Sequence, residues 1–171
     1  THLWMVALST IVATIGLATD NTAVLIGAMV IAPLLGPNMA LALACTLGDT
    51  PLARISLRTS CIGVRFAFVI AAFAGWIFEL NLESHEILSR TDLHLQDLLL
   101  ALAAGAAGAL AFTTGVPASL VGVMVAVALL PPLVVCALTA TSGHWPAAQG
   151  AAMLLAGNLI CVNLAGVATF L

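Results

Sequence analysis

Charged side chains are scarce in this chain: they make up 6% of its 171 residues, whereas 63% of the residues are hydrophobic. An ordinary soluble domain carries about 25% charged residues. The four basic and seven acidic side chains present could not cover the water-exposed surface of a globule of this size. This scarcity excludes a soluble domain and predicts an integral membrane protein.

Lysine and tyrosine are absent altogether. Four arginines against seven acids give a formal net charge of −3, which excludes the basic footprint that neutralises nucleic-acid phosphates. A membrane barrel would need alternating polarity and aromatic girdles, whereas the apolar runs here approach the 20 or so residues of a transmembrane helix. We therefore predict an all-α polytopic membrane protein whose surroundings are the lipid bilayer, with no nucleic-acid partner.

The cysteines form no recognisable ligand set. Cys45, Cys61, Cys136 and Cys161 lie in or beside apolar runs, with no CxxC pair and no close histidine partner. They are expected to fill apolar space rather than to form a zinc site or a disulfide framework. No Ser-His, Cys-His or paired-carboxylate arrangement lies in the apolar segments. The sequence thus predicts neither an enzyme nor a bound metal or cofactor.

Charges and turn residues divide the chain into six apolar segments. Six helices of about 20 residues account for about 120 residues, which leaves short loops and a single transmembrane domain over residues 1–171. The only long polar stretch, residues 81–97, follows the third segment. The six segments cover residues 3–18, 23–47, about 50–80, 98–112, 118–138 and 150–171.

The two halves of the chain resemble each other at an offset of 95 residues. Residues 19–48 align with residues 114–143 without a gap and share Gly-x-Met-Val and Leu-Leu-x-Pro cores. We predict an internal duplication, with repeat 1 at about 1–80 and repeat 2 at about 98–171. Because three spans are an odd number, the second copy enters the membrane from the opposite side. The prediction is therefore two inverted three-helix repeats.

The arginines predict an orientation. Arg54, Arg58 and Arg65 cluster between the second and third segments, while the next loop is acidic. The positive-inside rule then places this cluster and the N-terminal end in the cytoplasm, as a multi-pass protein of the cell (inner) membrane. Stripes of alanine and glycine on the fourth segment predict close helix packing, inside the bundle or between the subunits of a homo-oligomer.

A resemblance to a known family rests on residues 19–38, TDNTAVLIGAMVIAPLLGPN. This stretch resembles the signature of a prokaryotic membrane family known as the uncharacterised hydrophobic domain, or domain of unknown function 389. The Gly122 to Pro132 block and Gly157-Asn158-Leu159 with Asn163 fit the same family, so the resemblance covers essentially the whole chain. Some members carry a soluble segment before the membrane domain, which implies that this chain is a fragment. The family implies no substrate.

Prolines fall near the middle of the second and fifth segments. Pro33 and Pro37 flank Gly36, and Pro131-Pro132 stand in register with them. Each proline removes a backbone donor and clashes one turn back, and free carbonyls in a membrane must face protein or a watery cavity. We predict Pro-broken second and fifth helices whose ends bind a solute or ion. The alternative is a simple kink, with neighbouring groups satisfying the backbone.

Polar residues near these prolines are further candidates. Asp20 and Asn21 either cap a helix at the interface or place a ligand below the headgroups. Asn38 follows Pro37 and is expected to line the same cavity as the broken backbone. Asn158 and Asn163 are ligands or hydrogen-bonding glue between helices, and at five residues apart they cannot both face one narrow site.

These observations favour a transporter-like or channel-like protein that moves a small solute or ion between the two broken helices. The scarcity of intramembrane basic residues favours a neutral solute or a cation over an anion. The alternative is a non-transporting anchor or sensor that assembles a soluble domain outside this chain. The candidate binding residues are Asp20, Asn21, Pro33, Gly36, Pro37, Asn38, Pro131, Pro132 and Asn158.

Overall fold

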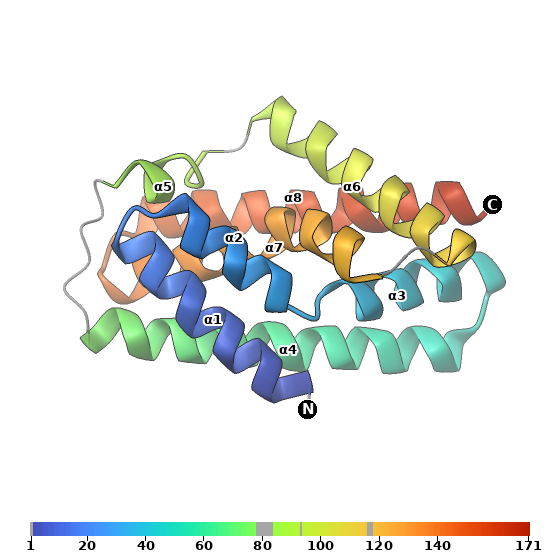
Figure 1. Ribbon diagram of the computed structural model, residues 1–171, viewed down its shortest axis with the longest axis horizontal. Coiled ribbons are helices and arrows are strands. Elements are labelled where there is room, and N and C mark those ends of the chain that lie inside the picture. Colours follow the sequence, from blue (N-terminus) through green and yellow to red (C-terminus); the bar gives the residue numbers. More distant parts are fainter. Residues whose placement is uncertain (1, 78–83, 93, 116–117) are drawn as a thin grey trace.

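The computed structural model describes residues 2–77, 84–92, 94–115 and 118–171, without the side chains of 118–124. In these ranges every regular element is an α-helix (Figure 1). The first half contains α1 (His2–Ala18), α2 (Thr22–Ile31), α3 (Leu35–Leu47) and α4 (Thr50–Ile77). The second half contains α5 (His85–Leu88), α6 (Leu95–Thr114), α7 (Ala118–Thr141) and α8 (Trp145–Phe170).

Among the described residues, the six predicted apolar segments are helical apart from residues 32–34 and Leu171, but the helices differ in length. Among the described residues, α4, α6 and α8 are each long and apolar enough to cross a membrane, and α2 and α3 qualify as a bent pair. This gives three candidate spans, or four with the pair. α1 and the Val125–Thr141 part of α7 are shorter apolar helices. The apolar helices are consistent with a membrane protein.

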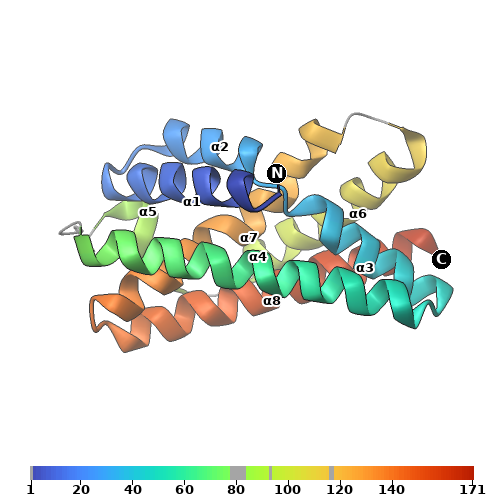
Figure 2. The ribbon, with the colours of Figure 1, turned by 90° about the horizontal axis from the view of Figure 1, so that it is seen from below.

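α7 lies at the centre of the bundle and packs on α8, α4, α6 and α2. It is apolar on all sides, as expected for a helix that other helices surround. Leu130, Val134 and Leu138 of α7 pack with Leu17 and Leu25 in one buried cluster. The two longest helices, α4 and α8, flank it and run in opposite directions (Figures 1 and 2).

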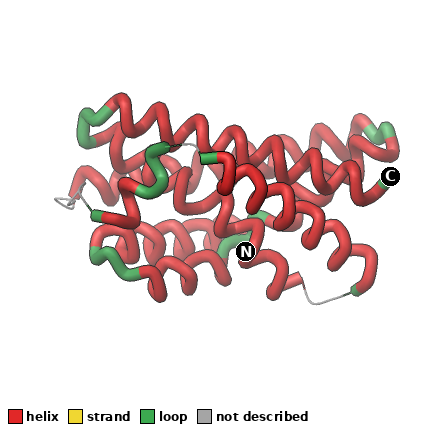
Figure 3. Tube along the Cα trace, turned by 90° about the horizontal axis from the view of Figure 1, so that it is seen from above, coloured by secondary structure: helices red, strands yellow, loops and turns green. Residues whose placement is uncertain are grey.

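The helical ladder is interrupted between α2 and α3, at residues 32–34, which we call the α2–α3 break. Pro33 has no N–H to donate, and Ala32, at the end of α2, already has an extended backbone. The axes of the two helices differ by 55°. Most loops lie at the two ends of the bundle, whereas this break lies part-way along it, near the N-terminus (Figure 3).

The predicted break at Pro131-Pro132 is wrong, because α7 continues through both prolines. The N–H that Pro132 lacks would have bonded to the carbonyl of Ala128, four residues earlier. Asn158 of α8 supplies the missing donor, since its Nδ2 donates to the Ala128 carbonyl at 2.8 Å. The alternative stated for these prolines, a backbone satisfied by its neighbours, is therefore what the second half contains.

Helix boundaries recur at the same offset as the sequence. α8 begins 95 residues after α4. Residues with positive φ follow α1, α3, α6 and α7, and they form two pairs that are each 95 residues apart: Asp20 with Gly115, and Gly48 with Gly143. Three of the four are glycines, which adopt this conformation without strain. Their φ angles are 51° at Asp20 and 72° at Gly115, then 67° at Gly48 and 78° at Gly143.

Candidate functional site

A cavity of about 260 Å³ lies beside the α2–α3 break, and we call it the break cavity. α1, α3, α4, α7 and α8 also contribute to its wall. An adjoining cavity of about 370 Å³ includes Gly36 and shares three lining residues with the first: His2, Pro33 and Pro37. The lining of the break cavity includes Pro33, Pro37, Asn38, Ser60, Gly63 and Arg65.

Helix lengths place the break cavity half-way along the bundle. α3 and α4 form a hairpin whose turn contains Gly48, and α3 has 13 residues, which amounts to about 20 Å at 1.5 Å per residue. Gly63 lies 13 residues after the first residue of α4, so it is level with the α2–α3 break. Since α4 has 28 residues, this level is also the middle of α4.

Buried polar groups sit at this apolar cavity. Asn38 is 4% exposed; its Nδ2 donates to the Leu34 carbonyl at 2.8 Å, and its Oδ1 accepts from Asn163 Nδ2 at 3.3 Å. The Oγ of Ser60 is buried and has no partner among the described residues, and the same holds for Asn163 Oδ1. An apolar cavity with a few convergent polar groups is the usual form of a small-ligand site.

The predicted site residues separate into three groups. Pro33, Pro37 and Asn38 line the break cavity, and Gly36 lines the adjoining one. The other candidates do not line the break cavity: the second-half prolines are buried inside α7, and the remaining three bond elsewhere. These residues are Pro131, Pro132, Asn158, Asp20 and Asn21.

Sequence reasoning missed Ser60, Gly63 and Arg65. For Gly63, the internal repeat contained a signal. The offset of 95 aligns Gly63 with Asn158, and it aligns Pro33 with Ala128. In the second half, the asparagine amide occupies the space beside the Ala128 carbonyl. In the first half, glycine stands at the equivalent position and a cavity is found there.

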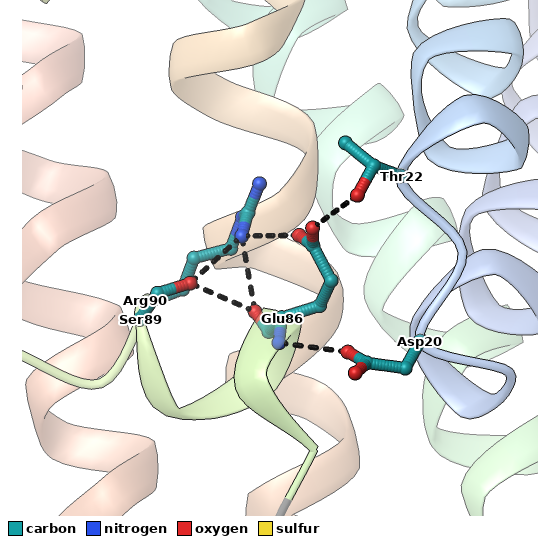
Figure 4. A network of polar contacts seen from close by, with 5 residues as sticks. All are labelled: Asp20, Thr22, Glu86, Ser89 and Arg90. Carbon is teal, nitrogen blue, oxygen red and sulfur yellow. Dashed lines mark hydrogen bonds and ion pairs between the residues drawn. The ribbon is translucent and has the colours of Figure 1, made fainter.

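Asp20 and Asn21 lie at the turn between α1 and α2, where Figure 4 shows a network of polar contacts. Asn21 caps α2, since its Oδ1 accepts from the backbone N–H of Ala23 and Val24. Asp20 Oδ1 accepts from the backbone N–H of Glu86 at 3.0 Å. We call the contacts of this turn with α5 the α5 clamp.

Glu86 is the centre of the α5 clamp (Figure 4). Thr22 Oγ1 donates to its Oε1 at 2.7 Å, and Arg90 Nη1 forms an ion pair with its Oε2 at 2.7 Å. Ile87, the next residue, is 1% exposed and belongs to the main apolar cluster. The clamp therefore fastens α5, in the connection between the two halves, to the turn between α1 and α2.

We expect Asp20→Asn to leave stability within about 0.5 kcal/mol of wild type, because an exposed amide oxygen accepts the Glu86 N–H as well as a carboxylate does. Asp20→Ala, which removes the acceptor, should cost about 1 kcal/mol. Thermal unfolding in detergent, across a panel of monovalent and divalent cations, measures both. Loss of a cation-dependent stabilisation in Asp20→Asn would instead assign an ion site to this carboxylate.

Residues 29–164 match the family model described as "Domain of unknown function (DUF389)". The chain belongs to the DUF389 family. Of its 171 residues, 169 align at 39% identity with "Uncharacterized protein MJ0678" of Methanocaldococcus jannaschii.

That alignment covers 99% of this DUF389 chain and 53% of the relative, so the chain spans about half of the relative's length. The search of solved structures gave no significant match. The resemblance read from residues 19–38 is confirmed at the level of the family. Neither the family description nor the name of the relative specifies a substrate.

Proposed function

We propose that this DUF389 chain is a transporter-like or channel-like membrane module that moves a small solute or ion through the break cavity. The observation that carries the proposal is the position of this cavity, half-way along the bundle and beside a backbone interruption. Irregular backbone at membrane depth is tolerated where it lines a cavity or is buried in protein. Transport sites of many secondary carriers are built in this way.

The proposal includes six spans arranged as two inverted repeats. It counts α2 and α3 as one broken span, and it counts α1 and α7 as spans despite their described apolar lengths. Three features support it: the helix boundaries at the offset of 95, the opposite directions of α4 and α8 (Figure 1), and a reciprocal pattern of packing. α3 packs on α8 as α7 packs on α4, which a twofold axis between the halves would produce.

The proposed route is asymmetric. In the second half, Asn158 bonds to the backbone at the proline level, so that half is closed. In the first half, Gly63 leaves the equivalent level open to α7 and α8, whose Leu129, Leu133 and Leu155 form the opposite wall. A solute at the α2–α3 break would therefore contact both halves, and a rocking motion between them would expose it to either side.

A non-transporting anchor is the second candidate. It is favoured by the relative, which is almost twice as long as the region it shares with this chain. In that function the break cavity would be an internal packing defect, closed to water in the membrane. Access of water to the cavity therefore separates the two functions.

Cys61 reports on this access, because it lines the break cavity in the middle of α4. In a variant of the intact protein that keeps Cys61 but carries Cys45→Ala, Cys136→Ala and Cys161→Ala, we expect a water-soluble thiol reagent to label the protein in sealed vesicles. Thiols react as thiolates, which require water. Mass spectrometry of the labelled protein measures the modified fraction over time.

A variant that keeps only Cys161 is the matched control. Cys161 lies on α8, is half-buried against an apolar cluster and does not line the break cavity, so it should label at least about tenfold more slowly than Cys61, because apolar surroundings disfavour the thiolate. Equal, slow labelling of both cysteines would contradict the transport proposal and support the anchor.

A further inference from the structure

We propose that the break cavity binds and passes a small anion, with Arg65 as the positive charge that selects it. This inference rests on the proposed function and names its substrate class. It departs from the expectation drawn from the sequence, which favoured a neutral solute or a cation because basic residues are scarce in the membrane segments. The reason for this change is the position of Arg65 on α4 and on the wall of the break cavity.

Arg65 cannot lie outside a membrane span formed by α4. The helix covers residues 50–77; the earliest 18-residue stretch within it ends at residue 67 and the latest begins at residue 60. Every such stretch therefore contains residues 60–67, and Arg65 with them. At 1.5 Å per residue, Arg65 is about 22 Å from one end of α4 and about 18 Å from the other. In every register Arg65 is therefore part of the span, and only its depth below the interface changes with the register.

The charge of Arg65 is not balanced by an acid of the described chain. The ion pairs in the described ranges are Arg90 with Glu86 and His94 with Asp97, both in the polar connection between the halves. Along the break cavity, the other titratable side chains are His2 and Cys61. A cation in an apolar span needs a partner or water, and an anion in the cavity would provide the countercharge.

Neutral donors converge on the same cavity. The Ser60 hydroxyl is buried without a partner among the described residues, and Ser60 and Arg65 both line the break cavity. α3 begins at the cavity with Leu34 as its N-cap, which contributes no side-chain hydrogen bond. The positive end of the α3 dipole therefore faces this region without a capping side chain, and the free N–H groups of its first turn belong to Leu35 and Gly36, which line the adjoining cavity.

The opposite end of the break, the C-terminus of α2, would favour a cation, but its carbonyls are partly satisfied. Ser9 Oγ donates to the Ala28 carbonyl at 2.7 Å, and the Ala32 N–H donates to Ala28 and Met29. Three groups at the cavity favour an anion: the charge of Arg65, the free Ser60 hydroxyl and the N-terminus of α3. We expect their attraction for an anion to exceed the attraction of these partly satisfied carbonyls for a cation. The sum of these groups points to an anion.

The test compares two reagents of opposite charge on the variant with Cys61 as its only cysteine in this chain. We expect the anionic sulfonatoethyl methanethiosulfonate to react faster than the cationic trimethylammonium-ethyl methanethiosulfonate, by about tenfold after normalisation to a free thiol, given one charge nearby at intermediate dielectric constant. Chloride, added in place of gluconate, should slow the anionic reagent by occupying the cavity. Arg65→Gln should abolish the preference, and Arg65→Lys should keep it.

Arg58→Gln is the matched control, since Arg58, like Arg65, is an exposed arginine of α4 but does not line the break cavity; it should keep the preference. An equal or faster cationic reaction at Cys61 would overturn the anion inference and leave the transport proposal standing, because the cavity would still be open to water. Failure of both reagents to reach Cys61 would count against the transport proposal itself. If Arg65→Gln does not fold, two measurements still test the anion inference. Chloride should slow the anionic reagent in the variant that retains Arg65, and Arg65→Lys should keep the preference for that reagent; the opposite results would overturn the inference.

Discussion

Replacing Gly63 by leucine is expected to lower solute flux through the reconstituted protein by about tenfold or more, because an added barrier of about 1.4 kcal/mol suffices for this factor. Gly63 lies on the wall of the break cavity. A side chain there would begin in open space, since the nearest atom to an added Cβ is His2 Nε2 at 3.7 Å. The leucine would therefore extend into the cavity rather than force helices apart.

Gly27→Leu is the control for Gly63→Leu. Gly27 is also a helical glycine, and nothing lies within 4 Å of an added Cβ there, but it does not line the cavity. Flux should stay at the wild-type level in this variant. A folded Gly63→Leu protein with unchanged flux would show that solute does not pass Gly63.

The second large effect concerns Asn158. Asn158→Leu is expected to destabilise the protein by about 1–3 kcal/mol, because the buried Ala128 carbonyl loses its donor. Pro132→Ala restores a backbone N–H at the position that normally bonds this carbonyl. In the Pro132→Ala background, Asn158→Leu should therefore cost less, and the double-mutant cycle should give a coupling energy of about 1 kcal/mol or more.

Asn163→Leu provides the comparison for this cycle. Asn163 Nδ2 bonds within its own helix to the Leu159 carbonyl at 2.9 Å and only weakly to Asn38. We expect a smaller loss of stability and no coupling to Pro132→Ala. Denaturation of all variants in the same detergent measures these energies. An equal cost of Asn158→Leu in both backgrounds would contradict the proposed replacement of the proline N–H.

The prolines show how far sequence reasoning reaches in this protein. Helical segments and their ends follow from apolar runs, glycines and caps, and these were predictable. Pro37 and Pro132 occupy equivalent positions, yet one lies next to a break and the other lies inside a continuous helix. Two differences accompany this outcome: Pro33 stands in the first half where the second half has Ala128, and the neighbouring helix has Gly63 in one half and Asn158 in the other. A prediction made only from the residues around a proline cannot include a hydrogen-bond donor on another helix, such as Asn158.

The candidate site was predictable in part for the same reason. Pro33, Pro37 and Asn38 are adjacent in sequence, so the break and its lining residues could be found together. Asp20 bonds to Glu86, 66 residues away, and nothing local to Asp20 indicates that partner. Arg65 was grouped with the arginines of the hairpin, whereas the observed length of α4 places it at mid-helix.

Flux through vesicles that contain the intact wild-type protein tests the transport proposal most directly. Vesicles loaded with potassium chloride and treated with valinomycin should release chloride faster than protein-free vesicles, and Gly63→Leu should return the rate to the protein-free level. Release of chloride at the protein-free rate, by protein shown to be folded and inserted and whose Cys61 neither thiol reagent reaches, would contradict transport and favour a membrane anchor.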